Sequence, residues 1–212
     1  MLTKKRLAFL AVSLFIGFLL ISRGVSTNAQ WIYQLDAYGN ELFRLDVTRE
    51  MTDRIFFLTQ IGSIRNLLYL ALVIGAILIL KKERKHFFWF GTTMAISGGL
   101  APLLIKTSMQ RARPTDGLFL RTGYSFPSGH TMGTLALYGL VILLCFMYIE
   151  KRWLRNTLVG LSLAIIILVS WSRIHLGVHF LTDIIGSVFL GVSLLIGSWL
   201  ALDFFNNSKN QY

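Results

Sequence analysis

The sequence TMGTLALYGLVILLCFMYI, at residues 131–149, contains no Asp, Glu, Lys or Arg. A helix that crosses a membrane needs about 20 mostly apolar residues, and this stretch has that length. Five more windows lack charged side chains, namely residues 7–22, 66–80, 87–105, 156–172 and 184–202. The shorter windows are flanked by Lys and Arg, whose long side chains reach the headgroups from within the membrane. We therefore predict six transmembrane helices.

The composition also favours a membrane protein. Of the 212 residues, 54% are hydrophobic and 15% are charged, and the mean hydropathy is +0.61. A soluble domain has about 45–50% apolar and about 25% charged residues. The apolar windows do not alternate with period two, and a helix satisfies its own backbone hydrogen bonds in hydrocarbon. The expected fold is an all-α, polytopic membrane protein, and residues 1–212 are interpreted as one domain because no linker or repeat interrupts them.

The basic residues follow a membrane topology rather than a nucleic-acid surface. The formal net charge is +11, but many Lys and Arg stand in short clusters beside the apolar windows and not on one continuous face. Cytoplasmic loops collect such residues. With both termini in the cytoplasm, the clusters at 4–6, 81–85 and 151–155 lie inside, and segments 23–65, 106–130 and 173–183 lie outside. We predict a multi-pass protein of the cell membrane whose motifs face outward, with no nucleic-acid partner.

The N-terminal stretch also fits a second interpretation. Residues 1–29 have the basic start and apolar core of a cleaved signal peptide, although no Ala-x-Ala site follows. Cleavage would leave the orientation of the other five helices unchanged. Residues 30–60 carry apolar side chains at mixed spacing, so we expect short interfacial helices that form a structural cover. The sequence assigns no chemical role to the outer segment 24–62.

The first polar motif is KTSMQRARP, residues 106–114, at the outer end of the third apolar window. Lys106 and Arg113 are seven residues apart, so they would share one face if the helix continued for two turns. Pro114 would then end that helix. We interpret the neighbouring Arg111 and Arg121 as solvated surface charges.

The second motif is YSFPSGH, residues 124–130, directly before the fourth window. Pro and Ser in this position mark the start of a helix. The first amides of a helix have no partner within it and its dipole is positive there, so the turn at Ser128 and Gly129 can bind phosphate. Gly129 lets the backbone approach a ligand closely, and His130 follows directly.

The third motif is SRIHLGVHFLTD, residues 172–183, between the fifth and sixth windows. His179 and Asp183 are four residues apart at the start of the last helix, so they would lie on one helical face. Asp183 can hold the proton of one ring nitrogen and leave the other nitrogen free to attack. Arg173 adds a permanent cation, and we interpret His175 as structural.

All three motifs fall on one side of the membrane when the six helices are counted. Together they supply three permanent cations, helix amides and two histidines, which suit phosphate chemistry. The patterns Lys-x6-Arg-Pro, Pro-Ser-Gly-His and Ser-Arg-x5-His-x3-Asp resemble the three signature motifs of the type 2 phosphatidic acid phosphatase family. The order of helices and motifs resembles that of the small bacterial members with six spans.

This resemblance implies a membrane lipid phosphatase that forms a covalent intermediate. His179 would attack phosphorus to form a phosphohistidine, Asp183 would stabilise the imidazolium, and His130 would protonate the leaving oxygen. The groups expected to bind the phosphate oxygens are Lys106, Arg113, Ser128, Gly129 and Arg173.

No metal ion or other cofactor is expected. The three cations take the role of a metal clamp and would repel Zn²⁺ from the two histidines and the aspartate. The expected partner is a lipid of the phosphatidylglycerophosphate, undecaprenyl pyrophosphate or phosphatidate class, because the motifs contact only the terminal phosphate. Its chains would lie in the bilayer near a bend in the third helix that Gly98, Gly99 and Pro102 permit. The sequence predicts no oligomeric state.

Other functions were compared with this prediction. A lipid phosphotransferase of the same family would use the same intermediate and pass the phosphate to another lipid, so this alternative stays open. A transporter would carry charges near the middle of the membrane, whereas the motif charges cluster at one interface. A catalytically silent relative would be expected to have lost a histidine or the aspartate. Vanadium haloperoxidases, which have related motifs, are soluble.

Overall fold

The chain folds into a bundle of long helices. The computed structural model describes residues 3–44, 47–115, 117, 119 and 122–208, and within these ranges it contains helices and connecting loops but no strand. Six helical segments are long and apolar enough to cross a membrane. The predicted all-α membrane fold with six spans is therefore confirmed.

The helices follow one another along the chain with short links except before α7. Their bounds are α1 (Lys4–Ser26), α2 (Gln30–Phe43), α3 (Arg49–Leu58), η1 (Thr59–Gly62), α4 (Ile64–Leu80), α5 (Arg84–Thr93), η2 (Met94–Leu100), α6 (Ala101–Met109), α7 (Gly129–Tyr148), α8 (Arg152–His175) and α9 (Leu181–Ser208).

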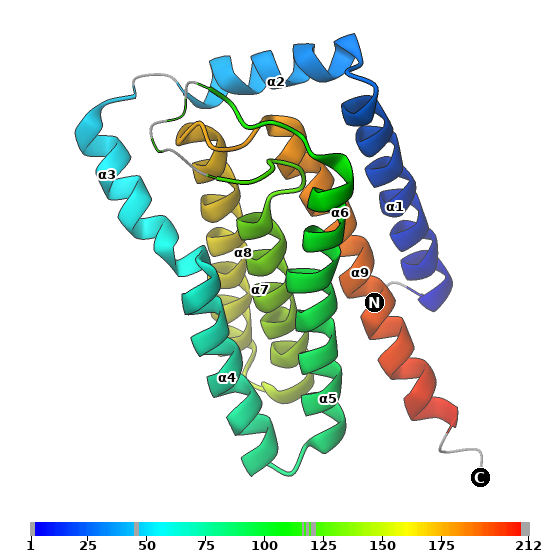
Figure 1. The fold of residues 1–212 in the computed structure, drawn as a ribbon. Helices are drawn as coiled ribbons and strands as arrows, with labels where there is room; N and C mark the ends of the chain where they lie inside the picture. The colour runs from blue at the N-terminus through cyan, green and yellow to red at the C-terminus, as the bar shows by residue number, and fades with distance from the viewer. Residues whose placement is uncertain (1–2, 45–46, 116, 118, 120–121, 209–212) are drawn as a thin grey trace.

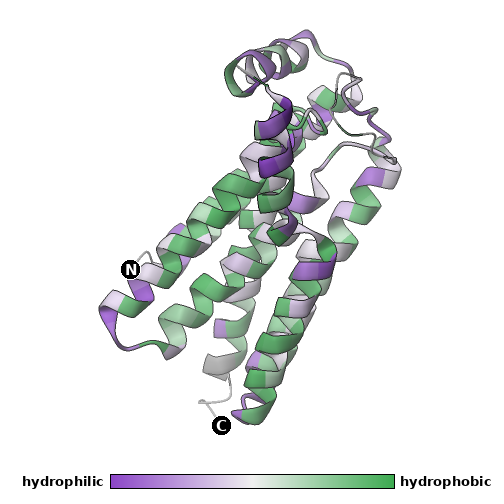
Figure 2. Cartoon of the chain, turned by 90° about the vertical axis from the view of Figure 1, so that its left-hand side faces the viewer, coloured by the Kyte–Doolittle hydropathy of each residue, from purple (hydrophilic) through white to green (hydrophobic). Residues whose placement is uncertain are grey.

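Helix α7 is the centre of the bundle, since it contacts α4, α6, α8, α9 and η2, while α1 packs along α9. Helix α2 lies across one end of the bundle, and the start of α1 and the end of α9 lie toward the other end (Figure 1). The ribbon has the colour of hydrophobic residues along most of the bundle, and hydrophilic residues gather at the end that carries α2 (Figure 2). The motif-bearing loops meet at this hydrophilic end.

The predicted short helices of the first outer segment are present as α2 and α3. Thr48 caps α3, its hydroxyl accepting from the amide of Met51 at 3.2 Å, which is the usual way to start a helix. The chain passes from α3 through the η1 turn into α4, so α3 extends the second span instead of lying flat beside it (Figure 1). Only α2 crosses the end of the bundle.

The third span departs from a regular α-helix, as Gly98, Gly99 and Pro102 led us to expect. Residues Met94–Leu100 form a π-helix, and Pro102 stands in the first turn of the following α6. A proline there needs no amide hydrogen, and a π-turn absorbs the misfit in the hydrogen-bond ladder.

The end of this span differs from our prediction. Helix α6 stops at Met109, because Gln110 adopts a left-handed conformation with φ +48° and closes the helix with a hydrogen bond from its amide to the Lys106 carbonyl. Such a residue is a common helix terminator. Arg113 therefore lies in the loop after α6 and does not share a helical face with Lys106, and Pro114 does not end the helix.

Helix α1 holds the loop before α7 in place. Phe18 stacks on Phe126, with 6.0 Å between ring centres, and both side chains are buried with Ile21 and Met132. Phe126 is two residues before Ser128, so the N-terminal span supports the turn that carries the second motif. This packing fixes the position of the α7 N-terminus relative to α9.

Candidate active site

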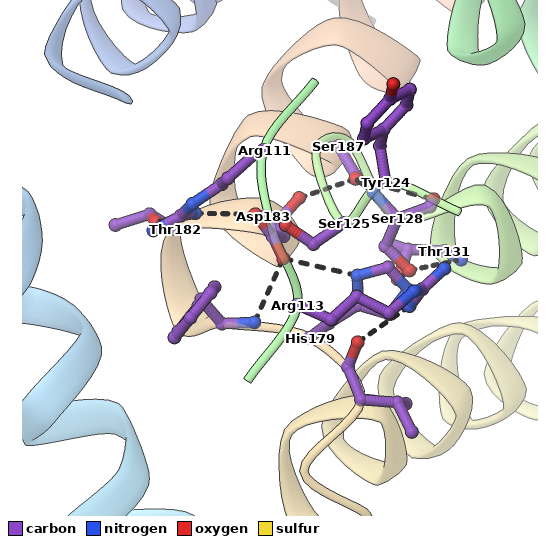
Figure 3. A network of polar contacts seen from close by, with 12 residues as sticks. Arg111, Arg113, Tyr124, Ser125, Ser128, Thr131, His179, Thr182, Asp183 and Ser187 are labelled. Atoms are coloured by element: carbon purple, nitrogen blue, oxygen red, sulfur yellow. Dashed lines mark hydrogen bonds and ion pairs between the residues drawn. The ribbon is translucent and has the colours of Figure 1, made fainter. Parts of the chain in front are cut away.

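The three motifs meet at the N-termini of α7 and α9. The loop 110–128 brings in the first motif, the link 176–180 between α8 and α9 carries the third, and the side chains converge as Figure 3 shows. Polar side chains that are buried at this place include Ser128, Thr131, Arg173, His179, Thr182, Asp183 and Ser187.

His179 and Asp183 are in contact, as their spacing predicts. The distance from His179 Nδ1 to Asp183 Oδ2 is 3.2 Å, and both side chains are buried. The geometry differs in one respect from our prediction, since His179 lies on the link before α9 and only Asp183 is inside the helix. Asp183 Oδ2 also accepts the amide of Phe180 at 3.0 Å, so the carboxylate folds back over the helix start and reaches the ring.

Arg113 identifies the tautomer of His179. Its Nη1 lies 3.2 Å from His179 Nε2. A guanidinium can only donate, so Nε2 must be the accepting nitrogen and Nδ1 must carry the proton that faces Asp183. The lone pair on Nε2 is the one a nucleophile needs.

The environment also keeps the ring of His179 neutral. Burial lowers the pKa of His179 below the value of a free imidazole, and the neighbouring Arg113 and Lys106 lower it further, against the opposing pull of Asp183. A neutral imidazole is nucleophilic, whereas an imidazolium is not. The site therefore presents a ring in the state required for attack.

The cations of the first motif are held by neutral carbonyl groups. Lys106 Nζ donates to the carbonyls of Tyr124 at 2.7 Å and Ser125 at 3.2 Å. Arg113 donates from Nε to Gly123 O at 3.0 Å and from Nη1 to Val178 O at 2.7 Å. These carbonyl partners orient both side chains and carry no net charge themselves.

The turn of the second motif is built for close approach. Ser128 is fully buried, and its hydroxyl caps α7 by accepting from the amide and hydroxyl of Thr131 at 3.4 and 3.1 Å. The Ser128 amide donates to Ser187 Oγ at 2.8 Å, which ties α7 to α9. A Cβ at Gly129 would lie 3.8 Å from Lys106 Cε, so the lysine passes directly over the start of the helix.

Two predicted residues lie at the edge of this cluster. Arg173 is 2% exposed, its carbonyl accepts the amide of His179 at 3.2 Å, and its guanidinium donates to Thr59 of η1 and to Ser172. His130 is the second residue of α7 and is half-buried. The structure thus joins Lys106, Arg113, Ser128, Gly129, His179 and Asp183 in one cluster and brings Arg173 to it through the backbone.

Our interpretation of Arg111 as a solvated charge is wrong. Its side chain is 12% exposed and forms ion pairs with Asp36 of α2 and Asp183 of α9. Asp36 itself is buried and was missed, because it lies 147 positions before Asp183 in the sequence and no local pattern connects the two. Arg121 lies outside the described residues.

His175 has the setting of a structural residue. Its side chain is fully buried, its ring centre lies 5.0 Å from that of Trp171, and its Nδ1 is 3.1 Å from the Phe43 carbonyl at the end of α2.

A cavity of about 180 Å³ reaches His179 and is lined on one side by α2, including Tyr33, Asp36 and Asn40. Helix α2 therefore forms one wall of a cavity beside His179.

A metal-binding cluster was not expected from the sequence. Among the described residues, no three His, Cys, Asp or Glu side chains are grouped as a bound metal ion would require. Metal independence stays a prediction, which activity in the presence of a chelator tests.

Comparisons with known proteins fit this geometry. Residues 86–207 match the PAP2 superfamily. The chain is 31% identical over 189 residues to phosphatidylglycerophosphatase B of Bacillus subtilis (strain 168), covering 86% of this chain and 90% of that protein. It is 32% identical over 139 residues to undecaprenyl-diphosphatase of Sulfolobus acidocaldarius, covering 61% of this chain and 58% of that protein.

A solved structure has the same fold. The crystal structure of a transmembrane PAP2 type phosphatidylglycerolphosphate phosphatase from Bacillus subtilis superposes with a TM-score of 0.77 at 24% sequence identity. The match covers 93% of this chain and 96% of that one. The similarity therefore extends over the whole bundle, including the spans outside the motif region.

Proposed function

The chain belongs to the PAP2 superfamily, and on that premise we propose that it removes the terminal phosphate group of a membrane lipid through a phosphohistidine intermediate. It is a multi-pass membrane phosphatase, a hydrolase of phosphoric monoesters. The proposal concerns its nucleophile, its membrane face and its substrate.

The line of contacts from Asp183 through His179 to Arg113 carries the proposal. Asp183 accepts the Nδ1 proton, Nε2 carries a lone pair, and the cation that faces this lone pair is one that phosphate oxygens bind well. When substrate enters, Arg113 would transfer this hydrogen bond to a phosphate oxygen, leaving Nε2 beside phosphorus.

The reaction would proceed in two displacements. In the first, His179 Nε2 forms a bond to phosphorus while the bond from phosphorus to the lipid oxygen breaks, and His130 donates a proton to that oxygen. In the second, water attacks the phosphohistidine and gives its proton to His130, so inorganic phosphate leaves and both histidines return to their first state. Lys106, Arg113, Arg173, the Ser128 hydroxyl and the Gly129 amide would stabilise the phosphoryl oxygens.

The substrate would be a lipid of the phosphatidylglycerophosphate, undecaprenyl pyrophosphate or phosphatidate class. The named activities of the two relatives concern phosphatidylglycerophosphate and undecaprenyl diphosphate. These lipids share a terminal phosphate, and the clustered groups are suited to that part of the molecule.

A direct test measures phosphate release by the purified protein in detergent with EDTA, using each of the three lipids. We expect wild-type turnover without an added acceptor lipid, which separates a hydrolase from a phosphotransferase. His179→Ala should abolish it, whereas His86→Ala, at the opposite end of the bundle, should not. Retained turnover in His179→Ala would refute the nucleophile assignment.

The site would face outward, because the short links at the other end, 81–83 and 149–151, lie within basic clusters. Single cysteines introduced as Asp53→Cys and Lys82→Cys test this in intact cells, since the native Cys145 is buried. We expect a membrane-impermeant thiol reagent to label only the first. Labelling of only the second would reverse the orientation.

A further inference from the structure

Helix α2 buries one carboxylate against the start of α9. Asp36 is 7% exposed, and its Oδ1 accepts from the amide and the hydroxyl of Thr182 at 3.0 and 2.8 Å. Its Oδ2 accepts from the guanidinium of Arg111. Because Thr182 lies in the first turn of α9, directly before Asp183, Asp36 accepts from an amide that has no partner within that helix, at its positive end.

Arg111 connects Asp36 to Asp183. Its Nη2 binds Asp36, while its Nη1 donates to Asp183 Oδ1 at 2.6 Å and to Thr182 Oγ1 at 2.8 Å. The guanidinium carbon lies 4.2 Å from the ring centre of Phe180, which restricts the plane of the group. Figure 3 shows Asp183 between Arg111 on one side and His179 on the other.

Each oxygen of Asp183 therefore has a separate task. Oδ1 accepts from Arg111, while Oδ2 accepts the amide of Phe180 and faces His179 Nδ1. A rotation of the carboxylate would break both sets of contacts. Arg111 thus fixes the oxygen that is offered to His179, and Asp36 keeps Arg111 from turning away by holding its other nitrogen.

Asp36 also affects the charge beside the nucleophile. A lone Arg111 would neutralise Asp183 and weaken its attraction for the imidazolium that forms during the reaction. With Asp36 present, two buried carboxylates share one guanidinium, so these three side chains together keep one negative charge on the Nδ1 side of His179.

A glycine in α2 permits the close approach of this helix to α9. A Cβ at Gly39 would lie 2.4 Å from Leu181 Cβ, so only glycine lets α2 come this near to the start of α9. The same helix ends where the Phe43 carbonyl meets the ring of His175 on α8. Helix α2, which carries Asp36, is thereby held against α8 and α9, and both of these helices carry residues of the third motif.

We propose that Asp36 and Arg111 are positioning residues, which hold Asp183 in the orientation that serves His179, and that α2 is part of the catalytic apparatus. This inference rests on the proposed function, because it requires His179 to act as the nucleophile. It replaces our expectation that the outer segment is only a cover.

The test uses near-isosteric variants of the full-length protein, purified in detergent and shown to be monodisperse. Asp36→Asn and Arg111→Lys should each lower kcat for lipid phosphate about 10- to 100-fold with little change in KM, because a small misplacement of the catalytic pair is enough. Lysine has one ammonium group and cannot hold two carboxylates as the fork of arginine does.

Matched controls come from the exposed ion pair of α3. Glu50 and Arg54 lie 2.6 Å apart with side chains 78% and 75% exposed. Glu50→Gln and Arg54→Lys make equivalent changes in the same outer segment, and kcat should stay within about twofold of wild type because exposed pairs contribute little.

The pH profile separates positioning from loss of structure. The groups facing His179 are Asp183 on α9, Arg113 in the loop and Lys106 on α6, and these variants leave all three in place. Asp36→Asn removes a negative charge, so the acid limb of the rate profile should move to lower pH, whereas Arg111→Met should move it to higher pH. Arg111→Lys keeps the charge, so its limb should stay near that of wild type although kcat is low.

The outcomes discriminate between the two proposals. If wild type is active and both Asp36→Asn and Arg111→Lys keep kcat within twofold, the inference is overturned while the proposed function stands. The same holds if neither Asp36→Asn nor Arg111→Met moves the acid limb. If wild type releases no phosphate, both proposals fail. If the Asp36 variant does not fold, the Arg111 variants provide the same comparison of kcat and of the acid limb of the pH profile, and the reverse also holds.

Discussion

Replacing Asp183 by Asn gives the sharpest test of the proposed nucleophile. Oδ2 of Asp183 meets two donors, the amide of Phe180 at 3.0 Å and Nδ1 of His179 at 3.2 Å, and Oδ1 meets a third, Arg111 Nη1, at 2.6 Å. An asparagine has one accepting oxygen. Whichever way its amide group turns, its NH2 faces at least one buried donor.

Both orientations of the amide are unfavourable for His179. With the NH2 toward the ring, Nδ1 must become the acceptor and Nε2 must take the proton, which removes the attacking lone pair and opposes the donor of Arg113. With the NH2 toward Arg111, two donors meet in a buried site. Leaving a buried donor without an acceptor costs about 1–3 kcal/mol.

These mismatches set the expected magnitude. The amide takes the cheaper orientation, in which one buried donor loses its acceptor, and about 1–3 kcal/mol corresponds to a loss of about 5- to 160-fold in kcat. The assay is steady-state phosphate release from lipid substrate in detergent, with Asp53→Asn, an exposed change in α3, as the matched control. If Asp183→Asn kept kcat within threefold of wild type, Asp183 could not be the group that selects the tautomer.

Five more outcomes are expected. Arg113→Lys should lower kcat/KM by about 10- to 100-fold in the same assay, because one ammonium cannot replace the bidentate phosphate contact of a guanidinium. Since burial lowers the pKa of His179, kcat should hold between about pH 7 and pH 6 in a rate profile and fall on further acidification. The same shift makes the protein less stable as the pH falls below about 6.5, since protonation then favours the unfolded chain, so the melting temperature in detergent should decrease. Incubation with EDTA should leave phosphate release unchanged, and activity restored only by added Zn²⁺ would contradict this. Gly186→Ala should lower the melting temperature, because its Cβ would lie 2.6 Å from Phe126 Cε2 and overpacking costs about 1–3 kcal/mol, and an unchanged melting temperature would refute the packing described here.

The features that could be predicted from the sequence depend on residues that are close together in the chain or on the helix length that the membrane requires. Six apolar windows define six spans because hydrocarbon requires long, uninterrupted helices. The contact of His179 with Asp183 was predictable since the two are four residues apart, and the contact survives although His179 lies just outside the helix.

The features that could not be predicted depend on distant partners. Arg111 looks like a surface charge in the sequence, and only the meeting of α2 with α9 supplies the two carboxylates that bury it. The end of α6 at Met109 could not be predicted either, because it depends on the left-handed conformation of Gln110. Glutamine carries no marked preference for that conformation.

The cations and the histidine of the site have different kinds of partner, and this difference explains how one site could attract a phosphate and still keep a basic nucleophile. Lys106 donates to two backbone carbonyls, which carry no net charge, so its own charge would attract a dianionic ligand. A carboxylate in place of these carbonyls would neutralise the lysine. Asp183 contacts Nδ1 of His179 and is shared with Arg111. Arg113 faces Nε2 and Asp183 faces Nδ1, so in the proposed mechanism the cation that would bind substrate and the carboxylate that would support attack lie on opposite sides of the imidazole.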